Sequence, residues 1–296
     1  MNKGLLIILL IGFSTTIIFA QDSVIIEQKE ILSVLTGNSK VSDNYTLKSR
    51  YTKEERKTVK SYLSKMIKNL SLEVEEHSYN FKNPYPNKSP KYFEGSNIYT
   101  IIKATTSSDE YVILGAHFDS VQDCPGANDN ATGVALVYSV AKKLAVLKKR
   151  NKNVLIIFFD QEEWGLIGSR AFSEYIKNKN LNVHSVHTID QMGWDEDGDR
   201  AIELELPTTA LKNLYAKEAK KMNIPVYTTE VNSTDHQAFR ERGFKAVGIT
   251  EEYENHDTTP FYHSTGDIYQ TVNFEYLTST TNLVFTVLKN LITKID

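Results

Sequence analysis

An apolar run that ends abruptly in acid is the feature of this sequence that points most directly to chemistry. Residues 154–159 read Val-Leu-Ile-Ile-Phe-Phe, and Asp160, Gln161, Glu162 and Glu163 follow at once. A run of this length and bulk is typical of a fully buried sheet strand. Adjacent carboxylates beside a core repel one another and are costly to desolvate, so we expect a positive group to neutralise them. A metal ion would do so directly.

Residues with metal-binding side chains lie at the ends of three further predicted strands. His117 follows one strand and can bind a metal through one ring nitrogen, while Asp119 can hold the other ring N–H. Asp190 ends another strand, and Glu251 follows a fourth. Each signal is weak alone, because an isolated His-x-Asp or a strand-end aspartate is more often structural.

Two loops add further candidates. Residues 125–133 form a glycine-bearing loop before a predicted helix, and Asp129 in this loop either caps the helix or bridges two cations. His263 lies in a later loop. The adjacent Glu162 and Glu163 allow one glutamate to bind metal while the other transfers protons. Together, two histidines and three carboxylates suit a pair of zinc ions.

Strands and helices alternate along the chain from residue 97. Strands are predicted at 98–102, 111–115, 154–159, 183–190 and 246–249, and helices at 132–149, 169–178, 209–222 and 274–293. This alternation predicts an α/β fold with three layers, α/β/α, and a mostly parallel mixed central sheet. Sites in open sheets of this kind form at the carboxyl ends of the strands, so one rim should collect the candidate residues.

The composition is that of an ordinary globular protein. The chain has 296 residues, of which 41% are hydrophobic and 24% charged, and its formal net charge is -3. That charge, with no basic patch, makes nucleic acid an unexpected substrate. The single cysteine, Cys124, excludes an intrachain disulfide and a cysteine-rich zinc knuckle, and we interpret it as incidental.

The chain divides into three predicted parts. Residues 1–20 read as a signal peptide, with a lone Lys3 before a short apolar segment, which predicts a secreted or periplasmic protein without membrane attachment after cleavage. An uncleaved anchor is the alternative, although the apolar segment is short for a membrane span. Residues 21–95 form a leader packed on the main domain, with a capping box and helix beginning at Thr52. Residues 96–296 form the core, and no linker divides 21–296.

Five motifs, in order, resemble those of the secreted bacterial two-zinc aminopeptidases, a family typified by leucyl aminopeptidases with a phosphorylase/hydrolase-like fold. They are Gly-Ala-His-Phe-Asp-Ser at 115–120, Pro-Gly-Ala-Asn-Asp-Asn at 125–130, Phe-Asp-Gln-Glu-Glu-Trp-Gly-Leu-Ile-Gly-Ser at 159–169, Asp190, and Tyr-His-Ser at 262–264. Residues 235–239 and 243–244 also resemble a family segment. The resemblance runs from about residue 97 to the C-terminus, and the leader matches only loosely.

The resemblance implies a role for each motif. It makes Asp129 the ligand that bridges two zinc ions and assigns the other ligands as His117 with Asp190 for one ion and Glu163 with His263 for the second. Asp119 would orient His117, and the peptide bond after Asp129 would be cis. The family often has a second aspartate where this chain has Asn130, a change that leaves the ligand set intact and makes the site less negative.

The implied activity is a zinc-dependent exopeptidase that removes N-terminal residues from peptides. A zinc-bound water would attack the peptide carbonyl with Glu162 as general base. Tyr262 either donates a hydrogen bond to the oxyanion or is a packing aromatic. Candidate substrate-pocket residues are Asp235, His236, Glu251 and Tyr253. We expect a monomer that acts on peptides, with two Zn²⁺, although other divalent metals also suit such ligands.

Three alternatives stay open. The same scaffold resembles carboxypeptidases, and it resembles glutaminyl cyclases that use one zinc. The short interval between His117 and Asp129 favours the peptidases over the cyclases. A non-catalytic binding module is less expected, because all five ligand positions and Glu162 are present.

Overall fold

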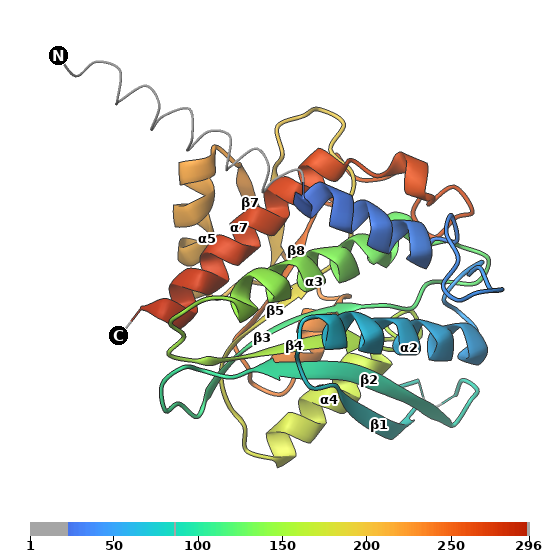
Figure 1. The fold of residues 1–296 in the computed structure, drawn as a ribbon, viewed down its shortest axis with the longest axis horizontal. Coiled ribbons are helices and arrows are strands. Elements are labelled where there is room, and N and C mark those ends of the chain that lie inside the picture. Colours follow the sequence, from blue (N-terminus) through green and yellow to red (C-terminus); the bar gives the residue numbers. More distant parts are fainter. Residues whose placement is uncertain (1–22, 86, 295–296) are drawn as a thin grey trace.

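One mixed sheet organises the molecule. The structure is a computed structural model that describes residues 23–85 and 87–294 (Figure 1), so the predicted signal peptide at residues 1–20 lies outside the described residues. Within these residues, eight strands pair in the order β1-β2-β4-β3-β5-β8-β6-β7. Their bounds are β1 Glu75–Lys82, β2 Tyr92–Ile102, β3 Glu110–His117, β4 Asn153–Phe159, β5 Asn182–Ile189, β6 Ile202–Glu205, β7 Val226–Thr229 and β8 Ala246–Thr250.

The four central strands, β4, β3, β5 and β8, are parallel to one another. Their register aligns their carboxyl ends, because His117 lies opposite Phe159 and Ile189 lies opposite Ile249. The outer strands β2 and β6 run antiparallel to this block. One edge of the sheet therefore collects the residues that follow four separate strands.

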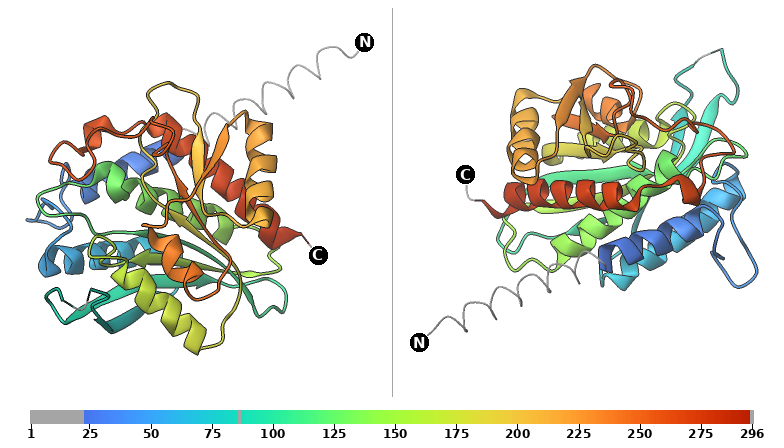
Figure 2. Two further views of the ribbon diagram at one scale, coloured as in Figure 1. Left: turned by 180° about the vertical axis from the view of Figure 1, so that it is seen from behind. Right: turned by 90° about the horizontal axis from the view of Figure 1, so that it is seen from above.

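Helices cover both faces of the sheet (Figures 1 and 2). They are α2 Lys53–Asn69, α3 Thr132–Ala145, α4 Ile167–Asn178, α5 Thr209–Met222, α6 Asp235–Arg240 and α7 Phe274–Thr293, and residues 23–35 are also helical. One face carries α2, α3 and α7, while α4 and α6 pack together on the other. The α/β/α architecture predicted from the sequence is confirmed.

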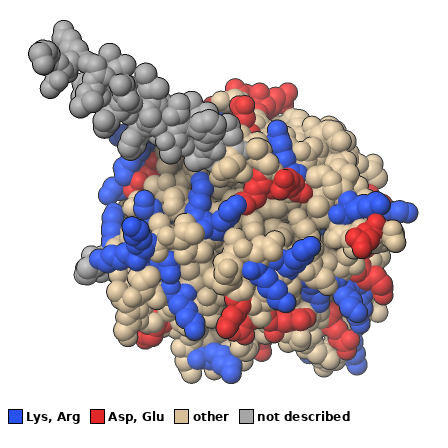
Figure 3. Space-filling model, in the orientation of Figure 1, with Lys and Arg blue, Asp and Glu red and all other residues tan. Residues whose placement is uncertain are grey.

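Burial explains which segments form the centre. Every residue of β4 is buried, as its unbroken apolar run predicts. Helix α3 is buried on almost all sides because it packs between β3 and α7. On the face that carries α3 and α7, acidic and basic side chains both occur across the surface (Figure 3).

Some elements differ from the sequence prediction. The helix predicted at 132–149 ends at Ala145, and the strand predicted at 98–102 begins at Tyr92, where it pairs with β1. Strands β1, β6 and β7 and helix α6 were not predicted, since β1 is a polar edge strand and the other three are four to six residues long. Helix α2 has the predicted capping box at Thr52. None of the helices between residues 23 and 294 has the length and apolar character needed to cross a membrane.

Candidate metal centre

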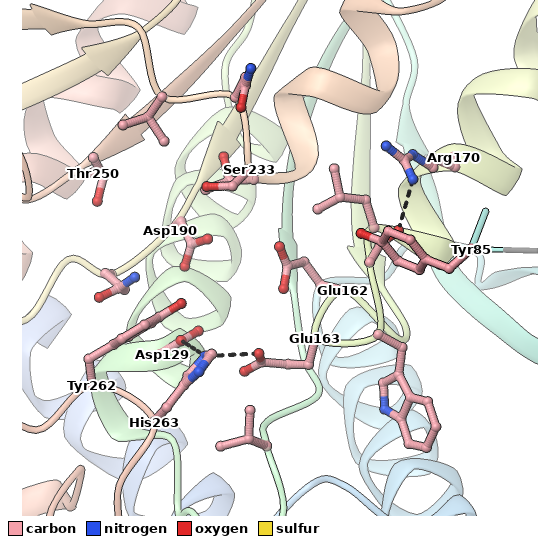
Figure 4. Close-up of a pocket in the computed structure, with 18 of the residues that line it drawn as sticks. Tyr85, Asp129, Glu162, Glu163, Arg170, Asp190, Ser233, Thr250, Tyr262 and His263 are labelled. Atoms are coloured by element: carbon pink, nitrogen blue, oxygen red, sulfur yellow. Dashed lines mark hydrogen bonds and ion pairs between the residues drawn. The ribbon is translucent and has the colours of Figure 1, made fainter. Parts of the chain in front are cut away.

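The predicted ligand residues meet at the carboxyl rim of the sheet. His117 is the last residue of β3, Glu163 follows β4, and Asp190 follows β5. Asp129 lies in the short turn Ala127–Ala131 that leads into α3, and its peptide bond to Asn130 is cis, as the resemblance implied. His263 lies in the loop between β8 and α7. Figure 4 shows Asp129, Glu163 and His263 side by side, with Asp190 and Glu162 above them.

Asp129 lies between two groups of ligand-type atoms. Its Oδ1 is 3.2 Å from His117 Nε2, and its Oδ2 is 3.3 Å from His263 Nε2. Asp190 Oδ1 is 3.4 Å from the same nitrogen of His117, and Glu163 Oε2 is 3.0 Å from His263 Nε2. Each group offers ligand atoms that all lie within 4.8 Å of one another. One carboxylate thus faces two clusters, one oxygen to each.

The unpaired buried atoms fit a pair of metal ions. His117 is 1% exposed, and its Nε2 faces the oxygens of Asp129 and Asp190 without a hydrogen bond of good geometry. Glu163 Oε1 and Asp190 Oδ1 are also buried and unpartnered. Buried polar atoms are rarely left without partners, so these atoms are suited to coordinate a metal ion. Imidazole and carboxylate donors in this number suit zinc.

Without a cation, three carboxyl groups of the cluster resist ionisation, those of Glu162, Glu163 and Asp190. Burial, with the negative charge of Asp129, raises the pKa of Glu163 to about 7, and burial raises that of Asp190 to about 6. Burial opposes protonation of His117, but Asp190 and Glu162 outweigh it and raise its pKa well above the usual 6.5. Burial, with Glu163, Asp235 and Asp190, also raises the pKa of Glu162 well above 4.5. A bound cation would therefore stabilise the ionised form of these carboxyl groups.

Asp119 supports both sides of the centre. Its Oδ1 is 3.5 Å from His117 Nδ1, which places the carboxylate beside the ring as predicted. The same oxygen accepts the backbone N–H of Glu162 at 3.0 Å, and Oδ2 accepts that of Glu163 at 3.2 Å. The side chain is fully buried. Asp119 thus connects the end of β3 to the two glutamates after β4, a role the sequence did not reveal.

A cleft of about 750 Å³ opens above the carboxylates. Glu162, Glu163, Asp190 and Tyr262 line it, and so does Tyr253. Tyr262 stacks on His263 with ring centroids 3.8 Å apart. Its ring is therefore a packing aromatic, while its cleft-lining position leaves the predicted hydroxyl role open.

Three predicted pocket residues lie behind the cleft wall and do not line it. Asp235 and His236 begin α6 and are 3% and 0% exposed, with His236 Nδ1 3.1 Å from Glu205 Oε2. Glu251 is fully buried, and both of its oxygens accept the side-chain amide of Asn128 at 3.0 Å. Glu205, which was not predicted, lines the cleft in their place.

Two further residues contact the Asp129 turn and were not singled out from the sequence. Asp267 accepts the backbone N–H groups of Asn128 and Asp129, and Arg50 donates to backbone carbonyls of the same turn. Asp267 lies in the His263 segment, so its spacing from a ligand was a usable signal. Arg50 lies in the leader and carried no signal, because the partners of its guanidinium are backbone atoms.

The fold and the ligand set together define a candidate dinuclear metal centre at the rim of an α/β/α sheet. The family model for peptidase family M28 matches residues 97–288, and the chain belongs to this family. The family resemblance stated from the motifs is thereby confirmed.

Two aminopeptidases are similar to more than half of the chain. Aminopeptidase YwaD of Bacillus subtilis is 30% identical over 183 residues, 59% of this chain and 40% of the relative. Aminopeptidase Y of Saccharomyces cerevisiae is 27% identical over 234 residues, 74% of this chain and 42% of that protein. The chain thus spans less than half the length of these two relatives.

Solved structures share the fold. BSAP, a zinc aminopeptidase from Bacillus subtilis, has a TM-score of 0.79 at 16% identity, covering 91% of this chain and 95% of that one. A glutaminyl cyclase from Bacteroides thetaiotaomicron has a TM-score of 0.72 at 17% identity, covering 91% and 97%. At these identities the likeness shows the fold alone.

Proposed function

We propose that the protein is a secreted zinc-dependent aminopeptidase that removes N-terminal residues from peptides. The observation that carries the proposal is the position of the Asp129 carboxylate, with one oxygen facing His117 and the other facing His263. Membership of peptidase family M28 and the aminopeptidase names of the relatives support the same activity.

The ligand assignment follows the two clusters. His117 and Asp190 would hold one zinc ion, Glu163 and His263 the other, and Asp129 both. Bound zinc supplies Lewis acidity, which polarises the scissile carbonyl and makes water a usable nucleophile near neutral pH. Hydrolysis also needs a general base close to these ligands.

Glu162 is placed to move the proton. It lines the cleft, and one of its oxygens lies within 4.8 Å of ligand atoms of His117 and Glu163. Its carboxylate accepts a proton from the attacking water as the new C–O bond forms, and returns it to the nitrogen as the C–N bond breaks. The hydroxyl of Tyr262 would donate a hydrogen bond to the oxygen that becomes negative.

The charges along the cleft favour a free amine over a free carboxylate next to the metal ligands. Glu162, Asp190 and Glu205 all line the cleft, and the charge of Glu205 adds to burial in raising the pKa of Asp190. Lys88 and Arg170 also line the cleft. Arg170 already has an acidic partner, because its Nη2 is 3.0 Å from Glu241 Oε1. Figure 4 shows Arg170 on the far side of Glu162 from Thr250. A substrate ammonium would therefore meet the carboxylates.

Export is part of the proposal and rests on the sequence alone. The positive and apolar pattern of residues 1–20 is that of a signal peptide, so a secreted or periplasmic location is expected. We further propose that residues 21–296 act as one domain and as a monomer.

The activity can be tested with one substrate pair and two variants. The protein with zinc should cleave a peptide with a free N-terminus and spare its N-acetylated form, and a chelator should abolish cleavage. Glu162→Gln should lower kcat by roughly 10²- to 10⁴-fold while zinc content stays at the wild-type level. The neighbouring Glu163→Gln is the matched control, and it should lose zinc. Equal cleavage of both peptides, or an active Glu162→Gln, would contradict the assignment.

Zinc content also separates the proposed activity from a cyclase. Near two zinc ions per chain supports the two clusters around Asp129, and near one supports the cyclase alternative. Cyclisation of an N-terminal glutamine, without release of a free amino acid, would favour that alternative directly.

A further inference from the structure

Arg50 is a fully buried arginine whose guanidinium hydrogen bonds all end on backbone carbonyls. Its Nε donates to Phe118 O at 2.6 Å, and its Nη2 donates to Gly126 O at 2.8 Å and to Asp129 O at 3.5 Å. Its Nη1 donates to Leu35 O at 3.1 Å and to Pro125 O. Phe118 lies between His117 and Asp119, so one guanidinium ties the end of β3 to the Asp129 turn.

The turn is shaped to receive this guanidinium. Gly126 has a left-handed φ of 63°, and a Cβ built there would lie 2.6 Å from Arg50 Nη2 and 2.5 Å from Asp129 O. Any side chain would therefore displace either the arginine or the turn. The close approach of Arg50 depends on glycine at this position.

Asp267 contacts the same turn as an acceptor of backbone N–H groups, whereas Arg50 donates to its carbonyls. Its Oδ1 accepts the N–H of Asn128 at 2.7 Å, and its Oδ2 accepts that of Asp129 at 3.0 Å. Its backbone carbonyl accepts the N–H of Ala127 at 3.2 Å. Asp267 lies four positions after His263 in the sequence. It therefore ties the turn to the second histidine, as Arg50 ties it to the first.

We propose that Arg50 and Asp267 form a positioning clamp that fixes the Asp129 carboxylate between the two histidines and so sets the affinity for the metal pair. This inference rests on the proposed zinc site and goes beyond it, because Arg50 precedes the matched family segment at 97–288. The leader then supplies part of the metal-binding apparatus. Neither clamp residue contacts a ligand oxygen of the cluster, so both act through the backbone of the turn.

Two conservative variants test the clamp on the full chain. Arg50→Lys keeps the charge, but a single ammonium cannot reach acceptors on Phe118, Gly126 and Asp129 together. Asp267→Asn keeps the shape and loses one of two acceptors. Each should remain folded by near-ultraviolet circular dichroism and bind zinc roughly 10- to 100-fold more weakly in competition with a chelating dye. At saturating zinc, kcat should fall more than KM rises.

Gln28→Met is the matched control. Gln28 is a fully buried polar residue of the same leader, and it bonds to Thr278 and Thr281 of α7, away from the clamp. This variant should lower the free energy of unfolding and leave zinc affinity unchanged. A clamp variant that behaves like Gln28→Met would show a purely structural role and overturn the proposal, as would failure of both clamp variants to fold.

The outcome separates the clamp from the proposed activity. Wild-type protein that binds two zinc ions but cleaves no peptide would end the aminopeptidase proposal and leave the clamp to be judged by zinc affinity. Normal peptidase activity with unchanged zinc affinity in both clamp variants would end the clamp alone. Wild-type protein that binds no zinc would overturn both.

Discussion

Replacing Asp119 with asparagine should weaken zinc binding without removing any ligand. The two carboxylate oxygens accept one backbone N–H each, from Glu162 at 3.0 Å and from Glu163 at 3.2 Å. An asparagine has one acceptor oxygen, so its NH₂ group would face the second N–H. A buried donor left unpaired costs about 1–3 kcal/mol. Because this cost destabilises the backbone arrangement that holds the metal ligands, zinc affinity should drop by roughly 5- to 150-fold.

The assay is zinc competition with a chelating dye, accompanied by kcat at saturating zinc. Asp123→Asn is the control, because it removes the same charge from an exposed residue whose φ of 59° suits asparagine equally well. Asp119→Asn should lower both zinc affinity and kcat, since its partners carry the proposed base and one ligand, whereas Asp123→Asn should change neither. Wild-type zinc affinity and kcat in folded Asp119→Asn would refute the reasoning.

Three other outcomes follow from the structure. Tyr262→Phe should lower kcat by about 10²-fold with little change in KM if the hydroxyl meets the oxyanion, and steady-state kinetics would show an unchanged kcat if the ring only packs on His263. Burial lowers the pKa of His187 to about 3, so His187 should stay neutral in the folded protein. The free energy of unfolding should therefore fall by about 1.4 kcal/mol per pH unit as the pH drops from 6.5 toward 3, because the unfolded chain takes up a proton there and the folded protein does not. Urea unfolding of His187→Gln should show a shallower fall across that pH range. Burial raises the pKa of the Cys124 thiol to about 12, so iodoacetamide at pH 8 should label it only after unfolding, and rapid labelling of native protein would contradict its burial.

The rim of the sheet was predictable because hydrophobic pattern and fold rule act together. The apolar runs of β4 and β3 indicate buried strands, whereas β5 has only single apolar residues between polar ones. Parallel strands then bring His117, Glu163 and Asp190 to one edge, although they are far apart in the sequence. No spacing rule was needed beyond strand length.

The supports of the site were not predictable in the same way. The Arg50 guanidinium bonds only to carbonyl oxygens, and every residue in the chain has a carbonyl oxygen, so these partners leave no mark on the sequence. Strands β6 and β7 are four residues long and lack an apolar run, and their position depends on pairing with β8. Glu205, at the end of β6, was missed for that reason.

Glu251 shows what the strand-end rule leaves undecided. The rule places Glu251 at the correct edge, yet its oxygens accept hydrogen bonds from Asn128, Thr258 and Thr259 and from the backbone N–H of Trp194. A carboxylate with so many donors is committed to holding its neighbours and has no lone pair to spare for a substrate amine. His117, Glu163 and Asp190 reach the same rim with buried atoms that lack partners. Hydrogen-bond satisfaction, which depends on segments distant in sequence, therefore separates Glu251 from these three residues where residue type and strand position cannot.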